Sequence, residues 1–229
     1  MSDRDAAKRA AAEAAVALVG NGMRLGLGTG STAYFVVEAL GRRIREEGLG
    51  ITGVPTSVAT GEHAASLGIP LTELAQVDAL DLAIDGADEV ECGSLALIKG
   101  LGGALLREKM IAEAARRFVI VADPGKVVER LGTSVPLPVE VIRFAHAATA
   151  RRLPGRPVLR MGADGQPFVT DNSNLIYDLH LDPIEDAAAL ENRLNTIAGV
   201  VEHGLFLHGV EQAIIGHPDG SVQTLRSSS

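Results

Sequence analysis

Residues 23–32, which read Met-Arg-Leu-Gly-Leu-Gly-Thr-Gly-Ser-Thr, decide the fold. The mostly apolar run 23–27 has the length of a β-strand, and the glycines after it permit a tight turn. Ser31 can cap a helix that we expect to run to about residue 45. A strand that passes through a glycine turn into a helix is typical of a βαβ unit, so this stretch predicts a parallel sheet.

Short apolar runs alternate with helices on both sides of this stretch. Several runs lack polar residues at every second position, as expected when both faces of a parallel sheet are covered. The predicted elements are, in order, helix 5–19, strand 23–27, helix 31–45, strand 51–54, helix 57–66, strands 69–71 and 80–84, helix 104–116 and strand 118–122. This order predicts a Rossmann-like domain with right-handed crossovers.

The chain after Lys126 has shorter elements separated by prolines. The predicted order is strand 139–141, helix 144–153, strands 158–161, 168–170 and 175–181, helix 184–196 and strand 200–206, with return strands within 212–225. This order indicates a ferredoxin-like α+β unit. We therefore predict an α/β fold in two parts. Residues 1–129 and 206–229 form a Rossmann-like parallel-sheet domain, and residues 130–205 form a smaller inserted ferredoxin-like α+β domain, the expected oligomer contact.

The composition excludes several classes of function. The 229 residues include 21 Lys and Arg against 29 Asp and Glu, and the net charge of −8 has the wrong sign for a general nucleic-acid-binding surface. The single cysteine, Cys92, cannot form an internal disulfide, and no charge-free apolar run of about 18 residues predicts a membrane span. Asp3, Asp5 and Glu13 are unlike a secretion signal, so we expect a cytoplasmic location.

The glycine turn is the first candidate binding element. Gly28 and Gly30 let the backbone approach an anion, the next helix offers free N–H groups, and Ser31 and Thr32 add hydroxyls. These features favour phosphate binding, although they also suit an ordinary βα turn. A dinucleotide site is disfavoured, because the third fingerprint glycine is missing and Val54-Pro55-Thr56 ends the next strand without an acidic residue.

A second candidate, Asp85-Gly86-Ala87-Asp88-Glu89, follows the expected central strand, at the edge where open α/β sheets bind ligands. Its carboxylates could bind sugar hydroxyls, move protons or hold a divalent metal, and aspartate is also common in turns without a function. The six histidines have no metal-ligand spacing, so the sequence predicts no transition-metal site.

A third candidate, Lys99-Gly100-Leu101-Gly102-Gly103, precedes a helix that contains Glu108. The lysine and the loop amides could stabilise a negative oxygen. Glu108 comes about one helical turn later, so its carboxylate can point back toward the loop; a solvated helix face is the alternative. Lys8 and Lys126 are further basic candidates that could equally be surface lysines.

Several motifs, in this order and at these intervals, resemble the type A ribose-5-phosphate isomerase family. They are GLGTGST (26–32), DGADEV (85–90), IKGLGGALLREK (98–109), VADPGK (121–126), LPVEV (137–141), VTDNSN (169–174) and IIGHPDG (214–220), and they cover essentially the whole chain. The resemblance implies an enzyme that interconverts D-ribose 5-phosphate and D-ribulose 5-phosphate through an enediolate. It also implies a homodimer or homotetramer that needs no metal or organic cofactor.

The resemblance further implies roles for single residues. Glu108 matches the catalytic base of the family, and Lys99 matches its substrate-activating lysine. Asp85 and Asp88 match the catalytic carboxylates of the sugar site. The matched substrate-binding positions are Lys8, Thr29, Gly30, Ser31, Thr32, Gly86, Ala87, Gly100, Leu101, Gly102 and Lys126. Two features differ from the family pattern: Leu101 stands where Gly is common, and Thr56-Ser57 replaces a more serine-rich segment.

Two other functions fit part of the sequence. A non-catalytic sugar-phosphate sensor needs the phosphate loop but not the Glu108 and Lys99 pair, and it normally accompanies a DNA-binding segment, which we do not find. A metal-dependent sugar-phosphate enzyme would use Asp85, Asp88 and Glu89 as ligands, and its activity would not survive chelation.

Overall fold

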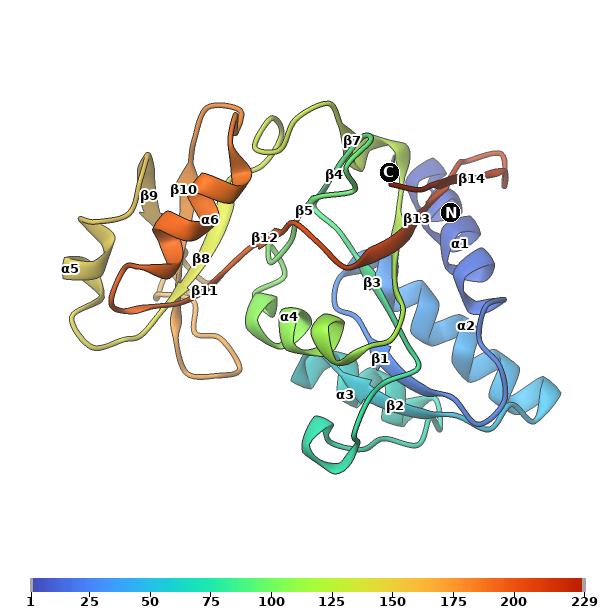
Figure 1. Cartoon of the computed structure of the whole chain (residues 1–229). Helices are drawn as coiled ribbons and strands as arrows, with labels where there is room; N and C mark the ends of the chain where they lie inside the picture. The colour runs from blue at the N-terminus through green and yellow to red at the C-terminus, as the bar shows by residue number, and fades with distance from the viewer. Residues whose placement is uncertain (1, 228–229) are drawn as a thin grey trace.

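The computed structural model describes residues 2–227, and its largest element is a six-stranded sheet (Figure 1). Its strands, in order across the sheet, are β14 (Val222–Leu225), β13 (Val210–Gly216), β6 (Phe118–Ala122), β3 (Leu82–Gly86), β1 (Arg24–Leu27) and β2 (Thr52–Pro55). All neighbouring strands are parallel except β14, which is antiparallel to β13. The predicted parallel sheet is therefore confirmed.

Helices cover both faces of this sheet. They are α1 (Asp3–Val16), α2 (Ser31–Glu47), α3 (Val58–Ser66) and α4 (Leu105–Ala114). Val119 and Val121 of β6 pack against α1 and α2, whereas Ile120 and Ala122 face the other side together with Ile111 of α4. Because both faces are covered, β6 is apolar and buried throughout. Within residues 2–227, no helix combines the length and hydropathy that a bilayer crossing requires.

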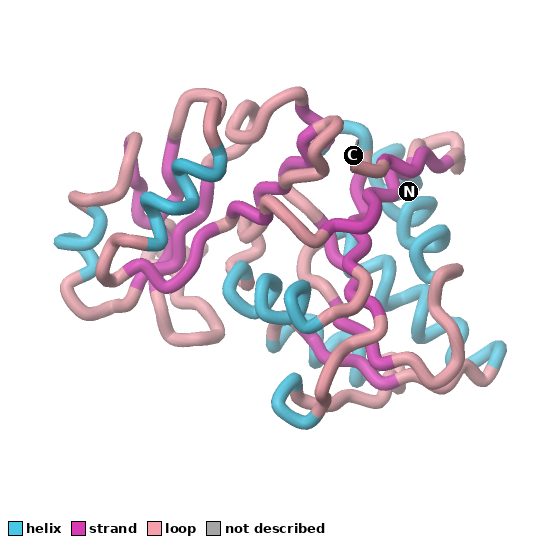
Figure 2. The backbone as a smooth tube through the Cα atoms, viewed as in Figure 1, coloured by secondary structure: helices cyan, strands magenta, loops and turns pink. Residues whose placement is uncertain are grey.

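A four-stranded antiparallel sheet forms a second unit, seen apart from the parallel sheet in Figure 2. Its strands, in order across the sheet, are β11 (Val200–His203), β8 (Leu137–Val141), β10 (Leu175–His180) and β9 (Arg156–Leu159), with helices α5 (His146–Ala150) and α6 (Ala187–Asn195). Along the chain the order is βαββαβ, so the ferredoxin-like prediction is confirmed. The domain boundaries, 1–129 with 206–229 and 130–205, stay a prediction.

A third sheet, which the sequence does not predict, lies between the two units (Figure 1). Its strands, in order, are β12 (Leu205–Phe206), β5 (Leu97–Ile98), β4 (Glu89–Glu91) and β7 (Val127–Val128). Two short 3-10 helices are η1 (Leu74–Gln76) and η2 (Pro124–Lys126). Strand β5 leads directly into Lys99, so this small sheet positions one of the candidate site residues.

Three predicted strands need correction. The run 200–206 forms two strands, β11 and β12, that belong to different sheets and are separated by Gly204. A Cβ at Gly204 would lie 2.2 Å from the carbonyl oxygen of Lys99, so the chain can pass there only as glycine. The runs 69–71 and 168–170 are not strands, because they form only isolated bridges.

Candidate functional site

The candidate active site is a cavity at the carboxyl ends of the neighbouring strands β1 and β3. It is lined by Thr29, Gly30, Ser31, Thr32, Gly86, Ala87, Asp88, Lys99, Gly100, Gly102, Glu108 and Lys126. Each of these is a position that the sequence singles out, so the fold brings the predicted segments together. Of the other predicted residues, Asp85 lies buried next to Lys99, Lys8 contacts Ser31, and Leu101 contributes a backbone contact.

A buried ammonium group lies between two buried carboxylates. Lys99 Nζ is 2.8 Å from Asp85 Oδ2 and 3.4 Å from Glu108 Oε2. It also donates a 2.6 Å hydrogen bond to the carbonyl oxygen of Gly86. No more than 3% of any of these three side chains is exposed. The three charges therefore interact with little screening by water.

Burial is the largest influence on the pKa values of this cluster. It raises the pKa of Glu108 to about 8, against the effect of Lys99 and with a further rise from Asp85 and Asp88. Burial also raises the pKa of Asp85, although Lys99 opposes the rise. For Lys99, burial lowers the pKa, but Asp85 and Glu108 outweigh burial and raise it above its usual value. Near neutral pH, a charged ammonium thus lies next to a carboxyl group that can gain or lose a proton.

Asp85 fixes the glycine turn after β1. Its Oδ1 accepts hydrogen bonds from the N–H groups of Thr29, at 3.0 Å, and Gly86, at 2.7 Å. A Cβ at Gly28 would lie 2.1 Å from the same oxygen, so the turn can approach this closely only with glycine. One carboxylate therefore ties the turn after β1 and the turn after β3 to the ammonium group of Lys99.

Asp88 lines the cavity and fixes the loop that follows Lys99. Its Oδ2 accepts a 2.9 Å hydrogen bond from the N–H of Leu101. The side chain of Leu101 is 37% exposed, and its φ is not positive, so this position does not require glycine. The departure from the family pattern at Leu101 therefore leaves the loop geometry unaffected.

The N-terminus of α2 is the part of the cavity best suited to an anion. Gly30, at the N-cap, has a φ of 103°, a conformation that favours glycine, and it has no side chain to occupy the free N–H groups. Lys8 of α1 donates a 2.8 Å hydrogen bond to Ser31 Oγ, and Lys126 lines the same cavity. Free amides, the positive end of a helix dipole and two ammonium groups suit a phosphate.

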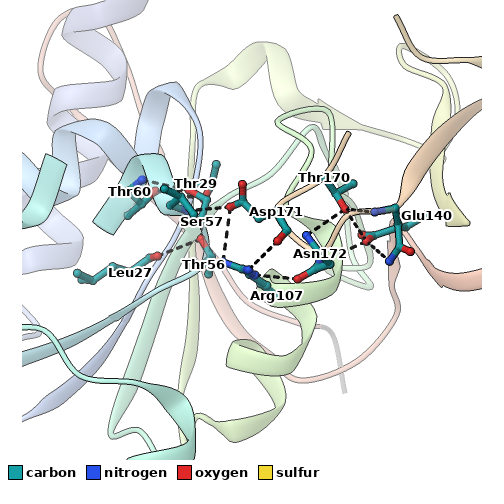
Figure 3. Close-up of polar contacts among 12 residues, drawn as sticks. Leu27, Thr29, Thr56, Ser57, Thr60, Arg107, Glu140, Thr170, Asp171 and Asn172 are labelled. Carbon is teal, nitrogen blue, oxygen red and sulfur yellow. Dashed lines mark hydrogen bonds and ion pairs between the residues drawn. The ribbon is translucent and has the colours of Figure 1, made fainter. Parts of the chain in front are cut away.

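The sequence does not predict the hydroxyl cluster that anchors Thr29 (Figure 3). Thr29 Oγ1 lies 2.6 Å from Thr56 Oγ1, 2.8 Å from Ser57 Oγ and 3.1 Å from Thr60 Oγ1. Thr56 and Thr60 donate in turn to the carbonyl oxygens of residues 27 and 28. The only sequence signal is a run of hydroxyl residues after β2, and Ser57 has an ordinary explanation as the N-cap of α3.

A second unpredicted network holds the helix that carries Glu108 (Figure 3). Nε of Arg107 donates to Asn172 Oδ1 at 2.9 Å, and Nη2 donates to the carbonyl oxygen of Asp171 at 3.0 Å. The Asp171 carboxylate accepts a 2.8 Å hydrogen bond from the N–H of Val58, the first residue of α3.

Buried Glu140 of β8 holds the other side of the segment 170–174. Its carboxylate accepts hydrogen bonds from the side chains of Thr170, Asn172 and Asn174. The segment 170–174 therefore connects α3, α4 and β8.

Glu89, which the metal-site alternative requires, is bound to the backbone of residues 132–135. Its buried carboxylate accepts hydrogen bonds from the backbone N–H groups of Gly132, Ser134 and Val135. Asp85, Asp88 and Glu89 are thus not assembled as a ligand set, and the part of the chain that is described, 2–227, holds no group of three or more His, Cys, Asp or Glu suited to a metal ion. The expectation that the reaction needs no cofactor stays a prediction.

Comparisons with known proteins agree with this geometry. The family profile "Ribose 5-phosphate isomerase A (phosphoriboisomerase A)" matches residues 52–220. Ribose-5-phosphate isomerase A of Synechococcus sp. (strain JA-3-3Ab) is 51% identical over 231 residues, covering 100% of both chains. The solved structure of ribose 5-phosphate isomerase A from Methanocaldococcus jannaschii has a TM-score of 0.91 at 43% identity, covering 96% of this chain and 98% of that one. A D-ribose-5-phosphate isomerase in complex with phospho-erythronic acid has a TM-score of 0.91 at 39% identity, covering 96% and 97%. The chain therefore belongs to the ribose 5-phosphate isomerase A family.

Proposed function

We propose that this sugar-phosphate isomerase interconverts D-ribose 5-phosphate and D-ribulose 5-phosphate through an enediolate. The observation that carries the proposal is the buried cluster of Lys99, Asp85 and Glu108 beside a cavity that also receives the N-terminus of α2. Aldose–ketose isomerisation needs a base that moves a proton between neighbouring carbons and a cation or donor that stabilises the negative oxygen. Both groups are present in this one cavity, and membership of the family supports the choice of substrate.

The phosphate of the substrate binds at the N-terminus of α2. There Ser31 and Thr32 offer hydroxyl and backbone donors, and Lys8 and Lys126 supply positive charge. The related structure in complex with phospho-erythronic acid, a phosphorylated sugar acid, supports a phosphorylated ligand in this fold. Although the whole protein is acidic, the attraction for phosphate is local.

The sugar ring opens before isomerisation, and Asp88 moves the hydroxyl proton. Asp88 lines the cavity, and one of its oxygens accepts from Leu101. Asp85 is less suited to this step, because Lys99, Thr29 and Gly86 already surround its carboxylate. We therefore assign Asp85 to holding Lys99 and the glycine turn in place.

Glu108 then takes the proton from C2 of the open aldose, which leaves the enediolate, and delivers it to C1. Meanwhile the proton of the C2 hydroxyl passes to the oxygen on C1, and C2 becomes the carbonyl of the ketose. The buried Oε2 of Glu108 lies 3.4 Å from Lys99 Nζ but accepts no hydrogen bond within the described chain, so this oxygen can still take up a proton. A pKa of about 8 means that about a tenth of the Glu108 carboxyl groups are ionised at pH 7, and about half at pH 8, so the carboxylate form is available near neutral pH. A base of this kind can both accept and return a proton within one turnover.

Lys99 stabilises the negative oxygen that develops next to the reacting carbons. Its pKa is raised by its carboxylate neighbours, so the ammonium stays charged throughout the reaction. The backbone N–H of Gly102 acts on the same oxygen from the side of the cavity that Gly100 and Gly102 line, whereas the N–H of Leu101 holds Asp88. A hydrogen-bond donor held in place toward a developing charge typically lowers the activation free energy by about 3–4 kcal/mol.

The test mixes purified protein with ribose 5-phosphate in the presence of a chelator and measures ribulose 5-phosphate. Conversion that survives exhaustive chelation supports the proposed reaction and excludes the metal-dependent alternative. Binding of ribose 5-phosphate without any conversion would instead indicate a sugar-phosphate sensor. The buried base and ammonium favour the enzyme, because a sensor gains nothing from a carboxyl group with a pKa of about 8.

The protein acts as a homodimer or homotetramer in this proposal, with a cytoplasmic location. Large apolar side chains on the antiparallel unit support self-association, since Phe144 is 84% exposed, Met161 52% and Val169 45%. Large apolar side chains that stay exposed are found at contact surfaces when they form a patch, and the self-association proposed here places these three in one.

A further inference from the structure

Arg160 connects the antiparallel unit to the loop that follows Lys99. It lies directly after β9, and only 12% of its side chain is exposed. Its Nη1 donates hydrogen bonds of 3.0 Å to the carbonyl oxygens of both Gly100 and Leu101. Asp178 of β10 holds the guanidinium from the other side, accepting from Nε at 2.9 Å and also from Nη2. The side chain is therefore fixed by the unit that it belongs to and reaches into the candidate site from there.

These contacts set the direction of the loop amides. No peptide bond in residues 2–227 is cis, and in a planar trans peptide the N–H points opposite to the C=O. Arg160 draws two successive carbonyls toward itself, so the N–H groups of Leu101 and Gly102 point away from it. The Leu101 N–H accordingly donates to Asp88 Oδ2 at 2.9 Å, and Gly102 lines the cavity.

A neighbouring aromatic ring supports the same loop. A Cβ at Gly103 would lie 2.4 Å from the Phe168 ring, so this ring packs directly against the loop backbone. The guanidinium carbon of Arg160 lies 5.9 Å from the centre of that ring. The N–H of Gly103 also donates to the carbonyl of Gly100 at 3.0 Å, closing the turn that Arg160 holds. Two side chains of the antiparallel unit thus support a loop of the other unit.

We propose that Arg160 is a positioning residue for isomerisation. It orients the peptide groups of residues 100–102 so that the N–H of Leu101 holds Asp88 and the N–H of Gly102 faces the negative oxygen of the enediolate. The inference rests on the proposed function, because it concerns the same cavity. Arg160 does not line the cavity and acts only through the loop. Its loss therefore lowers kcat, whereas KM, which depends on the phosphate contacts at α2, changes little.

The experiment compares three variants with the wild-type protein. Arg160→Met removes the hydrogen-bond donors, Arg160→Lys retains a cationic donor, and Arg156→Met changes an exposed arginine of β9 as a control. For each protein, kcat and KM for ribose 5-phosphate are measured, together with thermal unfolding and the inhibition constant of phospho-erythronic acid. This compound is chosen as a probe because its carboxylate is planar and negatively charged, like the O–C=C–O group of an enediolate.

We expect Arg160→Met to lower kcat about tenfold to hundredfold, with KM within about threefold of wild type. The reason is that a misdirected loop amide no longer stabilises the negative charge that develops on the enediolate oxygen. The inhibition constant should rise, Arg160→Lys should have an intermediate kcat, and Arg156→Met should match the wild type. A folded Arg160→Met protein with kcat within about twofold of wild type, or with a loss confined to KM, overturns the inference. Should Arg160→Met not fold, Arg160→Lys decides, since an unchanged kcat overturns it and a reduced kcat at constant KM supports it. Absence of turnover in the wild type would instead refute the proposed function.

Discussion

Glu108 and Lys99 show at the scale of single residues how burial prepares a site. Their charged groups lie 3.4 Å apart with almost no exposure, yet burial keeps the pKa of Glu108 near 8 in spite of the ammonium group. Desolvation therefore outweighs the ion pair at this carboxyl group. The opposite balance holds at Lys99, where two carboxylates outweigh burial. The same environment thus leaves one group able to exchange a proton and the other permanently charged.

Replacement of Glu108, the proposed base, is the first prediction. Glu108→Gln should lower kcat by about a thousandfold to ten-thousandfold, because proton transfer by a positioned side chain is typically worth about 10²–10⁴ and this residue serves both transfer steps. KM for ribose 5-phosphate should stay close to wild type, since the phosphate contacts at α2 are untouched. Steady-state kinetics check both quantities, and near-normal turnover would remove Glu108 as the base.

The same variant makes a separate prediction about stability. Between the usual pKa of 4.5 and the folded-state pKa of about 8, the folded protein holds a proton that the unfolded chain has lost. The contribution of Glu108 to the free energy of unfolding is therefore fully present below about pH 4.5 and falls as the pH rises toward 8. Glutamine has no such dependence, so Glu108→Gln should gain melting temperature relative to wild type across this range, levelling off above it. Thermal melts at about pH 5, 7 and 9 check the trend, which a constant difference would contradict.

Asp88 provides a prediction about the pH profile. Its negative charge contributes to the raised pKa of Glu108, so Asp88→Asn should lower that pKa and move the acidic limb of the kcat/KM profile to lower pH. Activity should also fall about a hundredfold, because ring opening loses its proton carrier. The profile is measured above about pH 7, where the substrate phosphate is doubly ionised. Asp78→Asn, at an exposed position, is the control, and an unmoved limb in Asp88→Asn would contradict the electrostatic argument.

At the scale of elements, the turn between β1 and α2 depends on a close approach to β3. Gly28→Ala would place a Cβ 2.1 Å from Asp85 Oδ1, so either the turn or the carboxylate must move. We expect a loss of about 1–3 kcal/mol in the free energy of unfolding, as for other overpacked sites, with a marked loss of activity. Gly20→Ala is the matched control, because its Cβ would meet only the end of Met23 at 3.4 Å. Urea unfolding of both variants checks the difference, and equal stabilities would show that the approach is not needed.

The elements that the sequence predicts best are those buried on both faces. Residues 118–122 form β6 with the predicted ends, because an uninterrupted apolar run is the direct result of double coverage. The two-residue strands β5 and β12 are too short to have a period, and nothing in their sequence distinguishes them from loop. The break at Gly204 follows from the position of Lys99, more than a hundred residues earlier in the chain, which no local pattern contains.

The residues of the candidate site also fall into two groups, those that the sequence predicts and those that it does not. The cavity-lining residues lie in glycine-rich segments at strand ends, so strand order alone brings them to one edge of the sheet. Arg160 and the network of Arg107 with Asp171 give no such signal, because their partners are 60 and 64 residues away and depend on how the two units pack. Sequence motifs therefore predict what lines the cavity, and tertiary packing decides what holds it in place.

The prediction at the scale of the whole molecule concerns assembly. In light scattering coupled to size exclusion, the wild-type protein should have the mass of a dimer or tetramer. The double variant Phe144→Ser and Met161→Ser should shift the population toward smaller species, because it removes exposed apolar area from the antiparallel unit. Tyr34→Ser, at a 50% exposed position on α2, is the control. A monomeric wild type would contradict the assembly, and an unaffected double variant would place the contact elsewhere.

Gly204 limits how freely the two units can be exchanged between relatives. At this residue the chain leaves the antiparallel sheet, and its carbonyl oxygen accepts a 2.9 Å hydrogen bond from the N–H of Lys99. A chimera that receives a foreign antiparallel unit must therefore keep a glycine at this junction, even if the graft folds perfectly well by itself. Any side chain there would push on the backbone of the residue that carries the ammonium group. The antiparallel unit has a sheet of its own, but the residue at which it ends, Gly204, must stay a glycine.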